Sequence, residues 1–151
     1  MGGYQMDILE NTIGKSYTGG CHCGAVKIKM TGPLYPFVAC HCSDCLRTSG
    51  TSWAAAKLGL DQLEFTSGEE NIDWYKSSEN AARGCCKTCH ANMFFRLDGS
   101  DLISIAPGMF DNYDGLEIKG HIYRKSLPEV CQNWEARPDI DDEFYSLQEQ
   151  D

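Results

Sequence analysis

The sequence predicts a single domain of mostly β structure, with little helix and with cysteine-bearing turns between short strands. Three observations lead to this prediction. The chain has 151 residues, enough for one domain with a core of its own. Apolar and polar residues alternate in short segments that end at glycine or proline. Seven of the nine cysteines fall into three tight clusters.

The first predicted strand covers residues 26–31. Its apolar side chains alternate with polar ones, as expected for a strand that has one face in the core. These apolar residues are Val26, Ile28 and Met30. Gly32 and Pro33 follow directly and end the strand.

A second strand is predicted over 37–40, where it runs into a cysteine cluster. One helical turn is expected over 44–49. Ser43 is the expected N-cap of this turn, because its hydroxyl can accept a backbone N–H, and Gly50 is expected to end it.

The rest of the chain also favours extended structure. Residues 52–58 predict a third strand, although 54–57 could equally propagate a helix. Further extended segments are expected at 63–66, 73–76, 92–97, 102–105 and 121–125. Only the tail, about residues 139–148, has a helical pattern. We expect one domain over 1–151, with a core at about 18–130 and an acidic flank at about 135–151.

Composition narrows the function classes. The net charge of −9 argues against nucleic acid as a partner, because phosphate contacts need clustered lysine and arginine. No stretch approaches the roughly 20 apolar residues of a membrane helix. The N-terminus shows no signal-peptide pattern, so a cytoplasmic protein is expected. Acidic residues crowd the C-terminal end as in a solvated flank: Asp139, Asp141, Asp142, Glu143, Glu149 and Asp151.

The three cysteine clusters have the spacing of metal ligands. They are Cys21-x-Cys23, Cys40-x-Cys42-x-x-Cys45 and Cys86-x-x-Cys89. A disulfide framework is the alternative, but the cysteine count is odd and Cys-x-Cys pairs are awkward to bridge to each other. Zinc takes four sulfur or nitrogen ligands in closed structural sites and three in sites that keep an open position. The sequence therefore predicts zinc.

Spacing alone does not decide which clusters share an ion. Cys21/Cys23 and Cys86/Cys89 together would clasp an early strand to a late one, and Gly20 and Gly24 would let the backbone bend around the ion. Cys40/Cys42 with Cys86/Cys89 is another possible set. In the first arrangement, the cluster Cys40/Cys42/Cys45 is self-contained and leaves one coordination position free.

Three segments occur in a characteristic order. They are Gly20-Cys-His-Cys-Gly-Ala-Val26, then Ala39-Cys-His-Cys-Ser-Asp-Cys45 with Arg47 and Gly50, then Arg83 ahead of Cys86-Lys-Thr-Cys89. A segment Gly108-Met-Phe-Asp111 follows. In this order and at these separations, over about residues 20–125, the sequence resembles the glutathione-dependent formaldehyde-activating family.

The resemblance implies a largely β fold of the Mss4-like type with two zinc ions. A closed structural zinc would lie on Cys21, Cys23, Cys86 and Cys89, and an open, catalytic zinc on Cys40, Cys42 and Cys45. The founding activity condenses glutathione with formaldehyde to S-hydroxymethylglutathione and is classed, in the reverse sense, as a carbon–sulfur lyase. The family also includes the centromere protein V domain, which has a non-enzymatic role. A zinc-stabilised binding module without turnover is therefore the alternative function.

Two residues near the last cluster depart from the family pattern. The family usually has an aromatic residue before its Cys-x-x-Cys and a glycine after it, where this chain has Cys85 and His90. Neither change removes a ligand. His90 would strain the turn if its backbone needs a positive φ. Cys85 and Cys131 are expected to be free core thiols.

The implied substrates are a thiol and a small aldehyde. Glutathione is anionic, so we expect a basic side chain near the open cluster, and Arg47 is the best candidate for binding its carboxylate. The other candidates are Lys57, Arg83, Arg96 and Arg124. His22 and His41 lie between ligand cysteines and would point away from the metal on an extended backbone. His41 is also a candidate proton shuttle.

Overall fold

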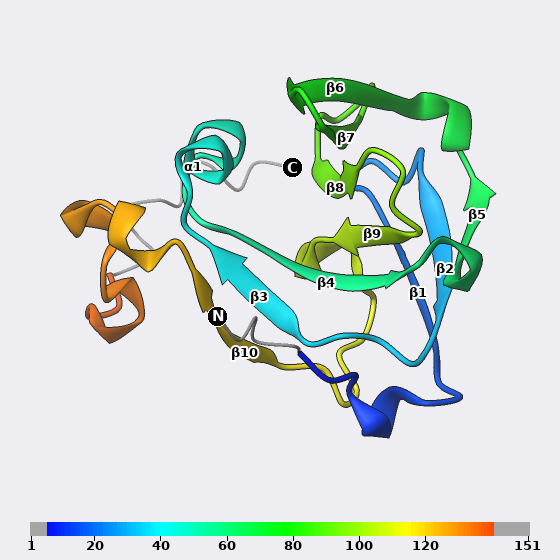
Figure 1. Ribbon diagram of the computed structural model, residues 1–151, viewed down its shortest axis with the longest axis horizontal. Coiled ribbons are helices and arrows are strands. Elements are labelled where there is room, and N and C mark those ends of the chain that lie inside the picture. The colour runs from blue at the N-terminus through cyan, green and yellow to red at the C-terminus, as the bar shows by residue number, and fades with distance from the viewer. Residues whose placement is uncertain (1–5, 141–151) are drawn as a thin grey trace.

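The computed structural model describes residues 6–140, which form a mostly β domain of two sheets (Figure 1). The smaller sheet has the order β1-β2-β5, with β1 (Ser16–Gly20), β2 (Lys27–Thr31) and β5 (Leu63–Ser67). The larger sheet has the order β10-β3-β4-β9-β8-β7-β6. Its strands are β3 (Phe37–Cys40), β4 (Trp53–Gly59), β6 (Ile72–Ser78), β7 (Ala81–Cys86), β8 (Asn92–Leu97), β9 (Leu102–Ile105) and β10 (Ile118–Ile122). Within these sheets, only β10 and β3 pair in parallel.

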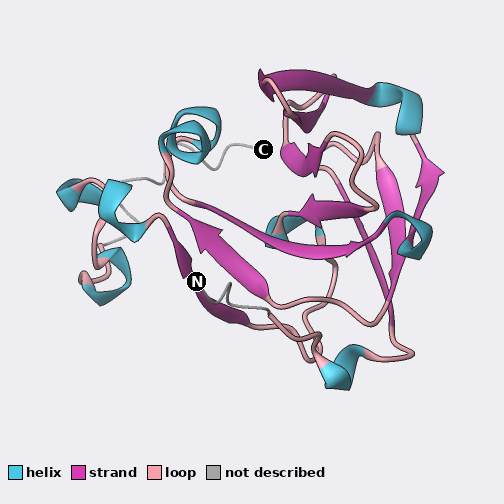
Figure 2. Cartoon of the chain, viewed as in Figure 1, coloured by secondary structure: helices cyan, strands magenta, loops and turns pink. Residues whose placement is uncertain are grey.

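Helical structure is sparse within residues 6–140. These residues contain one α-helix, α1 (Ser43–Ser49), between β3 and β4, and Figure 2 colours it cyan together with the 3-10 helices. Short 3-10 helices lie in the connections: η1 (Glu10–Thr12), η2 (Leu60–Gln62), η3 (Glu69–Asn71), η4 (Pro107–Met109), η5 (Arg124–Ser126), η6 (Glu129–Cys131) and η7 (Trp134–Ala136). None of the described helices is both long and apolar enough to cross a bilayer. The prediction of a mostly β domain with little helix is confirmed.

The core lies where the two sheets pack against each other. Along β2, Ile28 and Met30 are buried and the lysines between them are exposed, which is the alternation that the sequence predicts. The rings of Tyr17 and Phe37 both meet Phe110 edge-on, at centroid distances of 5.9 and 5.5 Å. A Cβ atom at Gly19 would lie 1.9 Å from the Met109 carbonyl oxygen. Glycine at this position therefore lets β1 approach the segment around η4.

The individual elements agree with the sequence in part. The strand at 37–40 has the predicted bounds, and the segment predicted at 52–58 forms strand β4 (Trp53–Gly59) rather than a helix. Cys42, not Ser43, is the N-cap of α1, because its sulfur accepts the Cys45 N–H, and Gly50 ends the helix in the left-handed conformation.

Three strands differ from the sequence-based expectation. The last strand was expected at 121–125 but is β10 at Ile118–Ile122. Strands β1 and β7 were not expected. The predicted helical tail at about 139–148 lies almost entirely outside the described residues.

Candidate metal centres

The structure brings the seven clustered cysteines together in two groups. The tetra-cysteine group contains Cys21, Cys23, Cys86 and Cys89, and the tri-cysteine group contains Cys40, Cys42 and Cys45. Within each group, all the sulfur atoms lie within 4.8 Å of one another. Of the two pairings that spacing left open, the structure therefore assembles Cys21/Cys23 with Cys86/Cys89. None of the nine cysteines forms a disulfide.

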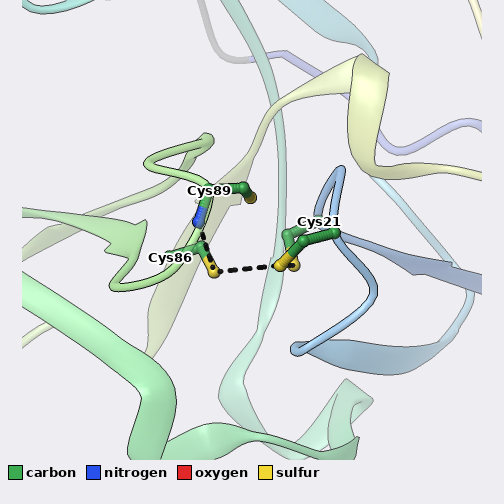
Figure 3. A group of neighbouring side chains, drawn as sticks. Cys21, Cys86 and Cys89 are labelled. Carbon is green, nitrogen blue, oxygen red and sulfur yellow. Dashed lines mark hydrogen bonds between the residues drawn. The ribbon is translucent and has the colours of Figure 1, made fainter. Parts of the chain in front are cut away.

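Two separate turns supply the tetra-cysteine group. The first turn follows β1, where the Gly24 N–H donates to the Cys21 carbonyl and Gly24 has a φ of +79°. The second follows β7, where the His90 N–H donates to the Cys86 carbonyl. In Figure 3, the side chains of Cys21 and Cys86 face each other from these turns. The Cys23 and Cys86 sulfur atoms are 3.8 Å apart.

Backbone and side-chain N–H groups point at these sulfur atoms. The Val26 N–H donates to Cys21 Sγ at 3.3 Å, and Thr88 N–H and Asn71 Nδ2 each donate to Cys86 Sγ at 3.4 Å. Such donors favour the thiolate over the thiol. The pKa of Cys86 is accordingly lowered to about 6, chiefly by the backbone N–H of Cys89. Four convergent sulfur atoms with thiolate-stabilising donors are a donor set that fits a structural zinc ion.

A single strand-to-helix junction supplies the tri-cysteine group. Cys40 ends β3, Cys42 caps α1, and Cys45 lies in the first turn of the helix. The Cys45 N–H donates to Cys42 Sγ at 3.4 Å. Burial raises the pKa of Cys40 to about 12, and the neighbouring thiols of Cys42 and Cys45 contribute to this increase. The backbone N–H of Cys42 acts in the opposite direction and lowers this pKa, but it does not outweigh them. Three thiols packed this closely cannot all ionise unless a cation compensates them, so this donor set also fits zinc.

One guanidinium lies beside the tri-cysteine group, and it belongs to Arg83. Arg83 projects from β7, is 6% exposed, and donates from Nη2 to Cys45 Sγ at 3.5 Å. Its Cζ lies 5.8 Å from the ring centroid of Trp53 and 5.2 Å from that of Phe95. The sequence ranked Arg83 only among the secondary candidates. No local pattern singled it out, because Arg83 lies on the buried face of β7, a strand that the sequence did not predict.

Arg47 lies on α1 and is exposed to solvent. It follows Cys45 by two positions, and residues two apart do not share a helix face. The other candidates Lys57, Arg96 and Arg124 are exposed as well.

The two histidines that lie between clustered cysteines have different surroundings. His22 is exposed, and His41 is buried. His41 contacts Ser52 Oγ through Nδ1, and its Nε2 lies 2.8 Å from Nδ1 of His121. Burial, followed by His121 and Arg124, lowers the pKa of His41. His41 lines a cavity of about 830 Å³ together with residues of β3, β4, β10 and the segment 124–135.

The structure also shows the surroundings of His90 and Cys85, which depart from the family pattern, and of Cys131. His90 has a φ of +62°, so the condition under which it strains the turn is met. Cys85 is half-buried in β7, and Cys131 is half-buried at the end of η6 and lines the same cavity as His41. As expected, neither forms a disulfide, but neither belongs to the buried core.

Comparison with known proteins gives a consistent result. A family model described as glutathione-dependent formaldehyde-activating enzyme matches residues 16–126. A protein of Colletotrichum graminicola, provisionally named as such an enzyme, is 27% identical over 60% of this chain and 52% of its own length. An uncharacterized lyase of Schizosaccharomyces pombe is 30% identical over 75% of this chain and 82% of its own length.

A further relative and a solved structure match as well. A Halomonas elongata protein, also provisionally named as a glutathione-dependent formaldehyde-activating enzyme, is 46% identical over 28% of each chain. The matched regions thus span about half or less of the Colletotrichum and Halomonas relatives. The crystal structure of a Rhodobacter sphaeroides protein from structural genomics superposes with a TM-score of 0.56 at 25% identity. That superposition covers 70% of this chain and 99% of the other.

If the tetra-cysteine group holds a structural metal ion, replacing Cys86 by Ser should remove one equivalent of bound metal and lower the free energy of unfolding by several kcal/mol, because metal binding and folding are coupled at structural sites. Metal analysis and thermal melting measure both effects. Cys85→Ser is the matched control, since its sulfur does not belong to the tetra-cysteine group. Full metal content and an unchanged melting temperature in Cys86→Ser would show that this group holds no structural ion.

Replacing His90 by Gly should raise the free energy of unfolding by up to about 1 kcal/mol, because glycine relieves the left-handed strain while its freedom in the unfolded chain offsets part of the gain. The His90→Ala variant also removes the imidazole but keeps a Cβ atom, so it should give no increase. Chemical denaturation of the metal-loaded proteins distinguishes the two. Equal stability of the glycine and alanine variants would contradict the strain argument.

Proposed function

The chain belongs to the glutathione-dependent formaldehyde-activating family, and from this premise we propose that it is a zinc-dependent enzyme of the carbon–sulfur lyase class. Its reaction would condense glutathione, or another thiol, with formaldehyde or another small aldehyde. The observation that carries the proposal is the tri-cysteine group, which within residues 6–140 has no fourth cysteine, histidine or carboxylate ligand. Catalytic zinc sites keep a position open in this way, and structural sites do not.

The proposed roles of the two groups differ. The tetra-cysteine group is complete and would hold zinc for folding. Bound to the tri-cysteine group, zinc would supply an open position at which a thiol loses its proton more readily and is held for reaction. Three thiolates on one divalent ion leave a surplus negative charge, which weakens its action as an electrophile. The site is therefore better suited to bind and position a thiol than to polarise a carbonyl strongly.

The reaction itself needs no redox partner. A carbon–sulfur bond forms between the thiol sulfur and the carbonyl carbon while the carbon–oxygen π bond opens. The proton that the thiol loses ends on the new hydroxyl group. The protein's contribution is to hold the thiol at a fixed point, which removes the entropic cost of bringing two solutes together.

An exposed basic side chain near the tri-cysteine group would bind a carboxylate of the substrate. We assign this contact to Arg47, whose exposed side chain lies on the same short helix as Cys45. We assign no step to His41, because its ring nitrogens contact Ser52 and His121 rather than a cysteine.

Glutathione should change the charge-transfer spectrum of the Co²⁺-substituted protein, and Cys42→Ser should abolish this response while the tetra-cysteine group keeps its metal. Arg47→Ala should weaken glutathione binding about threefold to fivefold, the effect of one exposed ion pair, and leave a small neutral thiol unaffected. Equal weakening of both thiols would remove Arg47 from the site.

Turnover needs its own measurement, since binding and catalysis are separable. In an NMR assay with ¹³C-formaldehyde and glutathione, the wild-type protein should accelerate S-hydroxymethylglutathione formation above the spontaneous rate, and Cys42→Ser should not. Thiol binding without acceleration would favour the binding-module function over an enzyme.

A further inference from the structure

We propose that Arg83 is the built-in counter-charge of the tri-cysteine group: its buried guanidinium balances the surplus negative charge that three thiolates leave on a bound divalent ion. The inference rests on the proposed function in one respect, namely that this group holds a divalent metal. Arg83 acts through the cysteines, so it is a positioning residue rather than a catalytic one.

The first argument is that Arg83 has no carboxylate partner among residues 6–140. Within residues 6–140 the ion pairs are Lys76–Asp98 and Lys119–Glu117, and neither involves Arg83. An unpaired charge in the protein interior is strongly unfavourable, and buried charges are therefore normally paired or bound to metals. A guanidinium that is 6% exposed thus points to a negative charge nearby. The sulfur of Cys45, 3.5 Å from Nη2, is the side-chain acceptor that the structure gives it.

The second argument concerns unsatisfied donors. Among the described residues, three buried side-chain nitrogens lack a hydrogen-bond partner: Trp53 Nε1, Arg83 Nε and Arg83 Nη1. All three belong to side chains at the tri-cysteine group, since Trp53 pairs with Cys40 across the β3–β4 ladder. Orphaned donors are rare in native proteins, and their concentration at one place indicates that negative charge belongs there.

The third argument is the charge balance. Three thiolates and one divalent cation carry a net charge of −1, and one guanidinium brings the group to zero. This compensation matters because Cys45 is 4% exposed and water cannot screen the surplus charge there. The tetra-cysteine group has a larger surplus but different surroundings. Its Cys23 is exposed, and its donors are backbone N–H groups and Asn71.

Two aromatic rings stabilise the buried guanidinium of Arg83 and fix its position. Arg83 lies near the rings of Trp53 and Phe95, which attract a guanidinium electrostatically. Phe95 is also the cross-strand partner of Arg83 in the β7–β8 pair. The two rings therefore hold the guanidinium beside Cys45 by packing, and the thiolates supply the missing charge.

The test compares Arg83→Met, which removes the charge but keeps a long side chain, with Arg83→Lys, which keeps the charge, and with Arg96→Met as control. Arg96 is exposed on the neighbouring strand β8. Competition with a chromophoric chelator gives the stoichiometry and the affinity of each site. Arg83→Met should weaken metal binding at the tri-cysteine group about 10- to 100-fold and leave the tetra-cysteine group unchanged. Arg83→Lys should recover part of the loss, and Arg96→Met should match wild type.

Melting temperatures of the single and double variants distinguish charge compensation by Arg83 from packing by its side chain. Arg83→Met should lower the melting temperature of the zinc-loaded protein clearly, but little or not at all in a Cys42→Ser background, where the tri-cysteine group no longer holds its metal. Equal losses in both backgrounds, unchanged metal affinity, or failure of Arg83→Met to fold in either background would overturn the proposal and leave Arg83 a packing residue. A wild-type protein that binds only one metal equivalent would instead refute the open site itself, and with it this inference.

Discussion

The fold depends on one long-range junction, the convergence of four cysteines from the turns after β1 and β7. Strand β1 belongs to the smaller sheet and β7 to the larger, and the contact between Cys23 and Cys86 spans 63 positions of sequence. A metal ion at this point would cross-link the two sheets and restrict the unfolded chain far more than any local turn does. The backbone supports this junction, since N–H groups of both turns point at the sulfur atoms. The left-handed His90 follows the second turn directly, so this junction also holds local strain.

The tri-cysteine group follows a different constraint, because all its members lie within six residues. Cys42 takes the N-cap position of α1, where a hydroxyl or carboxylate side chain is usual. Its sulfur caps the helix by accepting the Cys45 N–H. Such a group can form from local structure alone. What it cannot supply locally is charge compensation, and here it depends on β7, from which Arg83 reaches it across 38 positions of sequence.

This division between local and long-range structure explains what the sequence could predict. The strand at 37–40, the helix ended by Gly50 and the tri-cysteine group are local patterns, and sequence reasoning found them. The pairing of Cys21/Cys23 with Cys86/Cys89 joins distant segments, so spacing left it open and only the family resemblance implied it. Strand β7 was missed because its buried face carries Ala81 and Arg83 in place of large apolar residues. Strand β1 was missed because glycine is unfavourable in strands and this strand ends in Gly19 and Gly20. The structure needs glycine at position 19 for the approach to Met109. The bounds of β10 were wrong because neither of its faces is buried, so no alternation marks it.

The placement of the arginines shows the same limit and bears on function. Proximity in sequence favoured Arg47, but a residue two positions from Cys45 on a helix turns away from it, and strand pairing brings Arg83 to the sulfur instead. The two guanidiniums can therefore act at different distances from the same site. In the proposed reaction, an anionic thiol approaching the tri-cysteine group would meet a charge that Arg83 has raised by one unit. Low exposure near the sulfur atoms would leave this interaction poorly screened. Arg47, in water, can add only a weak and salt-sensitive contact at the substrate's outer end. Affinity for the thiol group should thus depend mainly on β7, and discrimination between thiols on α1.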